Sequence, residues 1–282
     1  MNTAWITGAG GLIGSYLVRS AARYAPVATV VALTHERLDL TDASAVRAMF
    51  RRQEPQLVIH CAALSRSPEC QANPALARKL NVEVTALLAD LAANIPLFFL
   101  SSDLVFDGRV GNYDETAPVN PLSVYAETKV AAEQVILQNP QHTVVRTSLN
   151  GGTSPKGDRG FNEQMRRAWQ AGQTLKLFTD EYRSPIPAEA TARAIWELAA
   201  LQQPGLYHVA GSERLSRWQT GQLLAARWPQ LTPRIEPGSL KKYSGAPRAP
   251  HTSLNCAKAQ ALLSFRLPGL TDWLAAHPDE AF

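Results

Sequence analysis

The sequence lacks a long apolar run and a concentrated basic stripe. No stretch of about 18 apolar residues occurs, which argues against a membrane span. Lysine and arginine outnumber aspartate and glutamate by 28 to 24 among 282 residues, and this excess is scattered along the chain. A nucleic acid is therefore a poor candidate partner, whereas an anionic small molecule is compatible with the charge.

Cysteine is also scarce, with Cys61, Cys70 and Cys256 as the three examples. These residues cannot all pair with one another, and their wide spacing matches no zinc-site pattern. The N-terminal segment has no basic region before its apolar residues, so it does not resemble a signal peptide. We therefore expect no metal and a reducing compartment, the cytoplasm.

The first half of the chain alternates short β-rich runs with helix-length segments, which is typical of a parallel sheet covered on both faces. Strands are expected at 3–7, 28–33, 56–60, 96–101 and 142–147. Helices are expected at 12–24, 42–53, 74–93 and 124–138, the third opened by the favourable N-cap and first-turn pair Asn73 and Pro74. This pattern predicts an α/β fold with a Rossmann-type, doubly wound parallel sheet.

The alternation weakens after Arg146 into the segment SLNGGTSPKGDRG, whose glycines and polar residues indicate a long loop. Beyond this loop, helices are expected near 161–171, 187–201, 216–227 and 255–263, with a short strand at 206–209. We expect residues 1–150 plus roughly 186–210 to form a dinucleotide-binding domain. Residues 151–185 plus 211–282 would form a smaller, irregular α/β region.

A glycine-rich turn, ITGAGGLIG, follows the first strand and opens the first helix, so Gly8, Gly11 and Gly14 have the spacing GxxGxxG. Glycine permits the tight turn and lets backbone N–H groups approach a pyrophosphate, while the helix N-terminus attracts the anion. A turn of purely structural value would show the same spacing. The strand-turn-helix context favours dinucleotide binding.

The end of the second strand, ALTHERLDLTD, has no carboxylate where an acidic residue usually binds the adenosine ribose hydroxyls and selects NAD. Thr34 and His35 stand there instead, and Arg37 follows as a cation for a 2′-phosphate. We therefore expect NADP as the cofactor. Glu36 keeps NAD as an alternative, and simple solvation of the loop would also explain His35 and Arg37.

The stretch SVYAETKVAAE places Tyr125 four residues before Lys129 within an expected helix. Residues at this spacing share a helical face, so both side chains can meet one ligand. An aromatic residue and a cation at this spacing also form ordinary packing pairs. The spacing alone leaves both interpretations open.

Several motifs in a fixed order run through nearly the whole chain: the glycine turn, LDLTD at 38–42, VIHCAA at 58–63, LNVEVT at 80–85, SSDLVFDG at 101–108, PLSVYAETK at 121–129 and VVRTS at 144–148. With these motifs the sequence resembles the extended short-chain dehydrogenase/reductases, and more narrowly the dTDP-4-dehydrorhamnose reductase group. The resemblance implies an NADP-dependent oxidoreductase that reduces the carbonyl of a nucleotide-linked keto sugar.

The resemblance assigns the catalytic roles to Ser102, Tyr125 and Lys129. Reducing a ketone places negative charge on its oxygen, so a proton donor is needed, and a tyrosine phenol can supply the proton. A nearby Lys129 ammonium would lower the pKa of Tyr125 from its usual value of about 10. Lys129 would also hold the nicotinamide ribose, and the Ser102 hydroxyl would bind the substrate oxygen.

The resemblance also implies a set of cofactor-binding residues and a support for the active-site helix. Asn81 would provide that support. The cofactor-binding set comprises Gly8, Gly11, Leu12, Ile13, Gly14, His35, Arg37, Asp39, Leu40, Ala62, Ala63, Ser101, Tyr125 and Lys129.

Substrate-binding residues are expected at Val105, Phe106 and Arg183. A diphosphate would need cations, which Arg183, Lys156, Arg159 and Arg248 could offer, although each is also readily explained as a solvated surface charge. The chain departs from many members of the group by carrying Leu104 and Leu149 where those have Tyr and Trp. Losing both aromatic surfaces puts dTDP-4-dehydrorhamnose itself in doubt as the substrate.

Two other functions share this fold and remain open. An epimerase or dehydratase would use the same Tyr and Lys, and a regulatory subunit of methionine adenosyltransferase would keep a nucleotide pocket without catalysis. The oligomeric state is expected to be a monomer or a homodimer.

Overall fold

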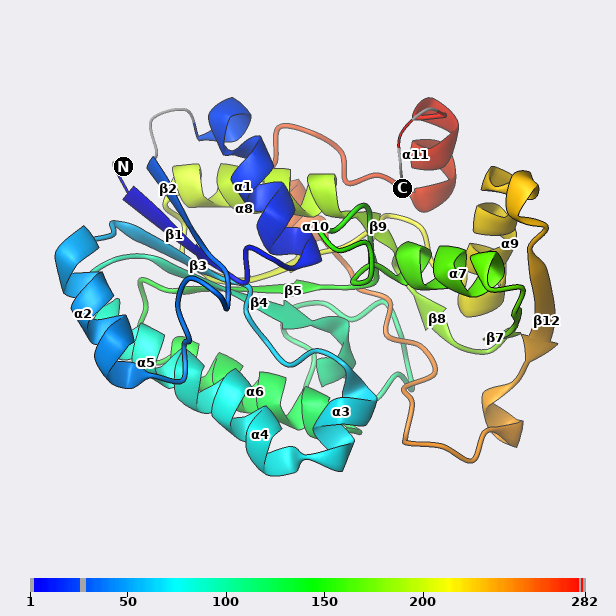
Figure 1. Cartoon of the computed structure of the whole chain (residues 1–282), viewed down its shortest axis with the longest axis horizontal. Coiled ribbons are helices and arrows are strands. Elements are labelled where there is room, and N and C mark those ends of the chain that lie inside the picture. The colour runs from blue at the N-terminus through cyan, green and yellow to red at the C-terminus, as the bar shows by residue number, and fades with distance from the viewer. Residues whose placement is uncertain (1–2, 26–28, 279, 281–282) are drawn as a thin grey trace.

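A computed structural model describes residues 3–25, 29–278 and 280 of the protein. Its core is a six-stranded parallel sheet in the order β10-β5-β4-β3-β1-β2 (Figure 1). Every neighbouring pair is parallel. The strands are β1 (Thr3–Thr7), β2 (Thr29–Leu33), β3 (Leu57–His60), β4 (Leu97–Ser102), β5 (Thr143–Thr147) and β10 (Gly205–Val209). The expected doubly wound α/β fold is confirmed, and the expected start of the second strand at residue 28 lies outside the described residues.

Helices cover both faces of this sheet, with α1 and α8 on one face and α2, α5 and α6 on the other (Figure 1). These helices are α1 (Leu12–Tyr24), α2 (Ala43–Gln53), α5 (Val84–Leu91), α6 (Val124–Ile136) and α8 (Ala188–Leu201). Successive residues of β1 point to opposite faces, so Ala4 and Ile6 join the core beneath α1 and α8 while Trp5 joins the other core. Each face of the sheet thus has its own apolar core.

The helical stretch before α5 is less regular than the single helix expected at 74–93. A separate α3 (Ser67–Ala72) precedes it, and α4 (Pro74–Arg78) continues through a π-helical segment (Lys79–Glu83) into α5. The expected cap is confirmed, because the Asn73 side chain accepts a hydrogen bond from Leu76 N at 3.0 Å. Periodicity could not reveal the π-helical segment, since its backbone bonds differ from those of an α-helix by a single residue.

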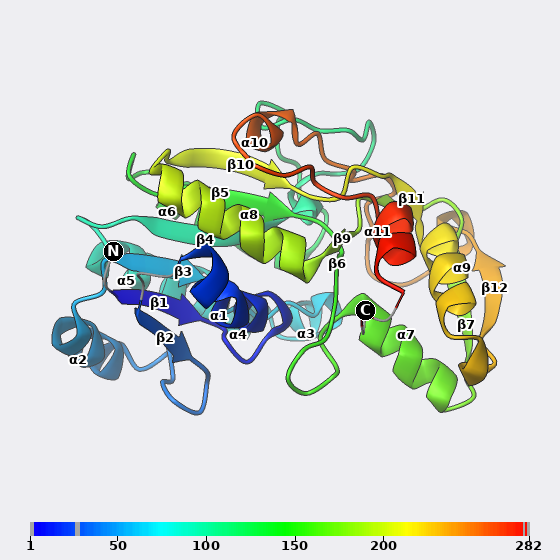
Figure 2. The same cartoon turned by 90° about the horizontal axis from the view of Figure 1, so that it is seen from above.

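The second half of the chain adds a group of smaller elements at one end of the molecule (Figure 2). They are β6 (Asn150–Gly151), α7 (Phe161–Gln170), β7 (Thr174–Phe178), β8 (Tyr182–Arg183), β9 (Ile186–Pro187), β11 (Leu215–Ser216), α9 (Arg217–Arg227), β12 (Arg234–Gly238) and α11 (Leu270–Ala276). The short helix α10 (Ala257–Gln260) instead lies beside β10 (Figure 2), and its Ala259 joins the core beneath α1 and α8. The expected helices near 161–171, 187–201 and 216–227 are confirmed, whereas the one expected at 255–263 is much shorter. A third apolar core, which includes Met165, Trp169, Leu177 and Trp228, holds these elements together.

Three short 3-10 helices complete the described elements: Asp103–Val105, Pro229–Leu231 and Leu240–Lys242. Among the described residues, no helix has both the length and the apolar character required to cross a membrane. No group of three or more His, Cys, Asp and Glu side chains in this part of the chain is arranged to hold a metal ion.

Candidate active site

The glycine turn joins β1 to α1 in a conformation that depends on its glycines. Gly8 has φ +66°, and a Cβ atom there would lie 2.7 Å from the backbone N of Ala62. A Cβ atom on Gly14 would collide with the Gly8 carbonyl oxygen, which accepts a hydrogen bond from Gly11 N at 2.8 Å. The first strand, the turn and the loop after β3 can therefore pack together only with these glycines.

Helix α1 begins at Leu12, directly after its N-cap residue Gly11. No side chain caps this end, and no acidic residue lies in the described first turn. Leu12 is buried and Ile13 is half-buried against the core, so both support the turn from behind. These features suit the pyrophosphate of a dinucleotide, because unpaired N–H groups and the helix dipole both favour negative charge.

The loop after β2 carries the residues expected to contact the adenosine ribose and its 2′-phosphate. His35, Glu36 and Arg37 are exposed, and the Arg37 guanidinium donates a hydrogen bond to Ala32 O at 3.0 Å. Asp39 instead accepts hydrogen bonds from Thr41 N and Oγ1, each at 2.9 Å, and these bonds lower the pKa of its carboxyl.

The neighbouring wall of this cleft is formed at the end of β3. The Thr7 hydroxyl accepts hydrogen bonds from Cys61 N and Ala62 N, both at 3.2 Å, which fixes the loop that follows the strand. Ala63 is exposed and Leu40 is half-buried. The glycine turn, the loop after β2 and the loop after β3 therefore meet at one edge of the sheet, where a parallel sheet of this kind binds ligands.

Ser102 and Tyr125 come together at the end of β4. The Ser102 hydroxyl accepts a hydrogen bond from Leu104 N at 3.2 Å and donates one to Asp103 Oδ1 at 3.2 Å. Tyr125 stands in the first turn of α6, which Ser123 caps by accepting a hydrogen bond from Ala126 N. Burial raises the pKa of the Tyr125 hydroxyl, and a hydrogen bond between Tyr125 and Ser102 acts in the opposite direction.

Lys129 shares the helix with Tyr125 but is directed toward the sheet. Its Nζ donates a hydrogen bond to Leu100 O at 2.6 Å and lies 3.9 Å from the centre of the Phe99 ring. Burial lowers the pKa of Lys129 to about 7, against the opposing effects of Glu133 and Cys61.

The expectation that Lys129 lowers the pKa of Tyr125 is wrong for this structure. Tyr125 is half-buried, and its partial removal from water and the charge of Asp103 both raise its pKa. The phenol therefore stays protonated at neutral pH, which is the form that a proton donor requires.

Asn81 connects the loop after β3 to α6. Its side-chain amide donates hydrogen bonds to Thr128 Oγ1 at 2.9 Å and to Leu64 O at 3.1 Å, and its oxygen accepts one from Leu64 N at 2.8 Å. Thr128 lies between Tyr125 and Lys129 in the same helix. Asn81 thus fixes the helix turn that carries both residues.

Ser101 does not face the cofactor cleft, contrary to its expected role. Its buried hydroxyl donates a hydrogen bond to Glu133 Oε1 at 2.5 Å. Glu133 in turn accepts two hydrogen bonds from Arg146, from Nε at 2.9 Å and from Nη2 at 2.7 Å, and we call these two residues the Arg146 pair. Ser101 therefore helps to satisfy a buried ion pair behind the site.

Val105 and Phe106 also lie elsewhere than expected. Both side chains are 0% exposed, and Phe106 stacks on Tyr113 with ring centres 4.1 Å apart. The 3-10 turn Asp103–Val105 directs them into an apolar core with Ala210 and Leu254. They offer no surface to a ligand in this structure and instead support the backbone beside Ser102.

Arg183 lies in a cluster of charged side chains, the Glu181 cluster, which consists of Asp103, Glu181, Arg183, Arg217 and Arg248. Arg183 pairs with Glu181 at 3.1 Å and with Asp103 at 3.6 Å, and Arg248 forms two hydrogen bonds with Glu181 at 2.6 and 2.8 Å. Burial raises the pKa of Glu181, but the hydrogen bond from Arg248 and the charge of Arg183 outweigh this effect. The pKa of Glu181 therefore stays below its usual value.

Asp103 links this cluster to Ser102. One carboxylate oxygen accepts the Ser102 hydroxyl, and the other accepts hydrogen bonds from Ser148 Oγ at 2.8 Å and Thr252 Oγ1 at 2.7 Å. The cluster contains three guanidinium groups and two carboxylates, so it has an unmatched positive charge next to the predicted catalytic residues.

Comparisons with known proteins agree with this geometry. Residues 2–280 match the family described as the RmlD substrate binding domain. The chain belongs to this family. It is 31% identical over 262 residues to a dTDP-4-dehydrorhamnose reductase of Mycobacterium tuberculosis, a match that covers 89% of this chain and 84% of that protein.

Two further relatives show the range of the family. The methionine adenosyltransferase 2 subunit beta of Xenopus laevis is 28% identical over 236 residues, which cover 80% of this chain and 71% of that protein. A crystal structure of a dTDP-4-dehydrorhamnose reductase from Bacillus anthracis in complex with NADP has a TM-score of 0.88 at 22% identity, covering 98% and 97% of the two chains. This second likeness shows the fold.

Sequence reasoning missed three members of the Glu181 cluster: Asp103, Glu181 and Arg217. A signal was available for Asp103, because it follows Ser102 directly in the SSDLVFDG motif that marks the family. Glu181 and Arg217 reach the site through the two-residue pairing of β8 with β11, which gives no recognisable pattern along the chain.

Proposed function

We propose that this chain is an NADP-dependent reductase that delivers a hydride to the carbonyl carbon of a nucleotide-linked keto sugar. The observation that carries the proposal is the hydrogen bond between the Tyr125 and Ser102 side chains at the end of β4. Reductase relatives that cover most of the chain support the same reaction.

The cofactor supplies the hydride when bound. The residues of the chain bind the cofactor, position the substrate and supply the proton. Gly8, Gly11 and Gly14 hold the pyrophosphate at the start of α1, while His35 and Arg37 receive the 2′-phosphate. Lys129 holds the nicotinamide ribose. Support for NADP comes from the absence of a carboxylate at the end of β2 and from the relative that is solved with NADP.

The proton for the substrate comes from the Tyr125 hydroxyl. The Ser102 hydroxyl proton turns from Asp103 to the substrate oxygen when the substrate binds and so positions that oxygen. The Tyr125 O–H bond breaks as the new O–H bond of the product alcohol forms. Solvent restores the proton to Tyr125 afterwards. Asp103 acts as a positioning residue, because its carboxylate holds the Ser102 hydroxyl in place.

The anionic part of the substrate lies at the Glu181 cluster. Arg183, Arg217 and Arg248 together carry more charge than the two carboxylates neutralise, and guanidinium groups suit the oxygens of a diphosphate. Keto-sugar reductases among the relatives support a nucleotide sugar as the substrate.

We also propose that two parts of the chain bind different ligands. Residues 1–150 plus roughly 186–210 bind the dinucleotide, since β10 completes the large sheet and α8 packs on α1. Residues 151–185 plus 211–282 bind the substrate and have their own apolar core. A reducing compartment, the cytoplasm, suits the three free cysteines, and the chain works as a monomer or homodimer.

The test is NADPH oxidation by the purified chain with a panel of dTDP- and UDP-linked 4-keto sugars. Tyr125→Phe should lower kcat by a factor of about 10² to 10⁴, the usual contribution of a general acid, while NADPH affinity changes little. Tyr207→Phe, which removes a hydroxyl bound to Gln203 O on the far edge of the sheet, is the control. Parent activity in Tyr125→Phe would contradict the assignment.

A non-catalytic regulatory subunit is the second candidate, because methionine adenosyltransferase 2 subunit beta proteins are among the relatives. Binding of nucleotides without turnover of any carbonyl substrate would favour this role. An epimerase or dehydratase would convert a nucleotide sugar without net consumption of NADPH, so analysis of the sugar product alongside NADPH oxidation separates all three functions.

A further inference from the structure

The loop between β6 and α7, residues 152–160, lies between α1 and α7 (Figure 2). We call it the strap. At its first residue, Gly152 exchanges two hydrogen bonds with the Asn162 side chain, at 3.1 and 2.9 Å. A Cβ atom on Gly152 would lie 2.7 Å from the Tyr16 hydroxyl oxygen, so the strap starts in close contact with α1.

The strap has a fixed shape because one buried carboxylate binds it from inside. Glu163 accepts hydrogen bonds from Ser154 N and Oγ, both at 2.7 Å, from Arg159 N at 2.9 Å and from Gly160 N at 2.7 Å. The residue is 7% exposed. Bonds from a carboxylate to several backbone N–H groups are stronger than neutral ones, so the strap is a defined structure.

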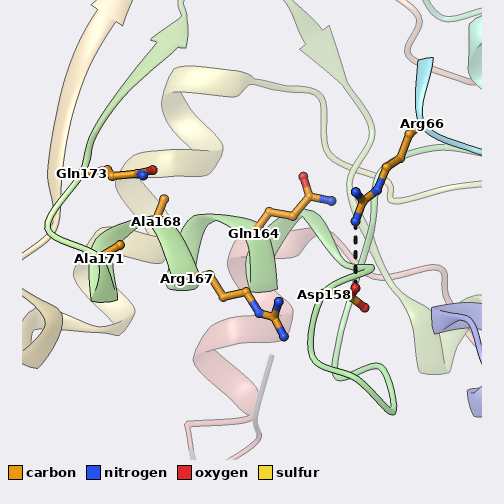
Figure 3. Close-up of a pocket in the computed structure, with 7 residues that line it drawn as sticks. All are labelled: Arg66, Asp158, Gln164, Arg167, Ala168, Ala171 and Gln173. Carbon is orange, nitrogen blue, oxygen red and sulfur yellow. Dashed lines mark ion pairs between the residues drawn. The ribbon is translucent and has the colours of Figure 1, made fainter. Parts of the chain in front are cut away.

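Contacts with the dinucleotide-binding half then set the direction of the strap. Thr153 N donates a hydrogen bond to the Tyr16 hydroxyl at 3.1 Å, and Arg19 donates one to Thr153 O at 3.2 Å. On the other side, Asp158 pairs with Arg66 of the loop after β3 at 3.9 Å, next to a shallow pocket of about 320 Å³ along α7 (Figure 3). The strap thus touches α1, the helix that follows the glycine turn, and the loop after β3, which is one wall of the cofactor cleft.

Lys156 at the tip of the strap reaches a second wall of this cleft. Arg167 holds its backbone by donating a hydrogen bond to Lys156 O at 2.7 Å. The Lys156 ammonium lies 3.8 Å from Glu36 Oε1, in the loop after β2. Glu36 is the single carboxylate in the THER segment that would otherwise face a 2′-phosphate.

We propose that Lys156 is a cofactor-specificity residue that binds the 2′-phosphate of NADP from the strap and neutralises Glu36. This inference rests on the proposed function, because it assumes NADP as the cofactor. Arg37 already uses one of its N–H groups on Ala32 O, so a second cation strengthens the phosphate site. The earlier expectation placed Lys156 at the substrate diphosphate, whereas its ion-pair partner lies on the cofactor side.

The test is calorimetric titration of NADP(H) and NAD(H) into the parent, Lys156→Ala and Lys242→Ala. Lys242 is an exposed lysine of the 3-10 turn Leu240–Lys242 and controls for the loss of charge. Lys156→Ala should weaken NADP(H) binding by about threefold to tenfold, as expected for one exposed charge-assisted contact, and leave NAD(H) binding unchanged. The difference should shrink as salt screens the pair.

A second variant tests the role assigned to Glu36. Glu36→Gln should strengthen NADP(H) binding in the Lys156→Ala background, because the unpaired carboxylate then no longer opposes the phosphate. Adenosine 2′,5′-bisphosphate and AMP should repeat the pattern, since they differ only at the 2′-phosphate.

The outcomes separate this inference from the proposed function. A parent that prefers NADP(H), together with a Lys156→Ala variant that keeps the whole preference, overturns the inference alone. Equal weakening of NADP(H) and NAD(H) also overturns it, because Lys156 would then act only through the shape of the strap. A parent without any preference for NADP(H) overturns the cofactor assignment and this inference together.

Discussion

Two ion clusters lie next to the end of β4, and they differ in charge balance. The Arg146 pair joins one guanidinium to one carboxylate, with side chains 5% and 4% exposed, and Ser101 satisfies a further lone pair of Glu133. The Glu181 cluster surrounds two carboxylates with three guanidinium groups.

This difference indicates different roles. A pair with equal charges and complete hydrogen bonds needs no ligand to neutralise it. The Arg146 pair therefore serves to hold α6 on β5. The Glu181 cluster has one cation more than it has carboxylates, and its Arg248 side chain is 37% exposed, so it offers a cation to an anionic ligand. It lies one residue from Ser102 through Asp103. Charge balance and exposure together therefore distinguish a structural cluster from a binding cluster.

Breaking the balanced pair should have the largest effect on stability. Arg146→Met leaves the Glu133 carboxylate buried and uncompensated, which costs about 3–5 kcal/mol in the free energy of unfolding. Urea titration measures this change. The double variant Glu133→Leu/Arg146→Met should recover most of the loss, because it removes the stranded charge; a double variant as unstable as the single one would contradict a purely structural pair.

Breaking the unbalanced cluster should instead affect binding. Arg217 lies in the electrostatic field of both Glu181 and Asp103, and burial lowers the pKa of its guanidinium to about 10. Arg217→Gln should weaken dTDP binding about tenfold to a hundredfold, the range for one or two hydrogen bonds to a charged group, with a smaller change in stability. Calorimetry with dTDP measures the effect.

Arg214→Gln is the matched control for that prediction. Arg214 is exposed, lies three residues before Arg217 and covers the Tyr182 ring at 4.6 Å. Its loss should leave dTDP binding unchanged. If Arg217→Gln destabilises the fold as strongly as Arg146→Met and binds dTDP like the parent, the Glu181 cluster is structural after all.

The two clusters also show what could be predicted from the sequence. The strands that carry Ser102 and the glycine turn are local, β-rich runs with clear boundaries, and the sequence predicts them within one or two residues. Tyr125 and Lys129 share a helix, so their proximity also follows from spacing alone.

The rest depends on contacts between distant segments. Glu181, Arg217 and Arg248 meet because β8 pairs with β11 through two residues and because Tyr182 bridges to His251, and such short pairings leave no periodic signal. Local sequence was misleading for Phe106, which neighbours Ser102 along the chain but turns into the core. Which side of a turn faces the ligand is decided by packing that the turn itself does not encode.

Lys129 is a buried cation outside both clusters. It extends the comparison, because its ammonium donates its hydrogen bond to the Leu100 carbonyl and not to a carboxylate. Burial lowers its pKa to about 7 from 10.5. Between these two values the unfolded chain binds a proton that the folded chain does not, so folding stability rises with pH in this window. Below it both states are protonated, and the cost of burying the charge is complete.

Lys129→Met removes this dependence. Measured without cofactor, the unfolding free energy of the parent should rise relative to the variant by up to about 1.4 kcal/mol per pH unit above pH 7. Lys258→Met is the control, because Lys258 also donates to a backbone carbonyl, Leu206 O at 2.8 Å, and covers the Tyr207 ring, but is exposed. Parallel pH profiles for the parent and Lys129→Met would mean that Lys129 stays charged in the fold, and a buried ammonium would then need no carboxylate partner here.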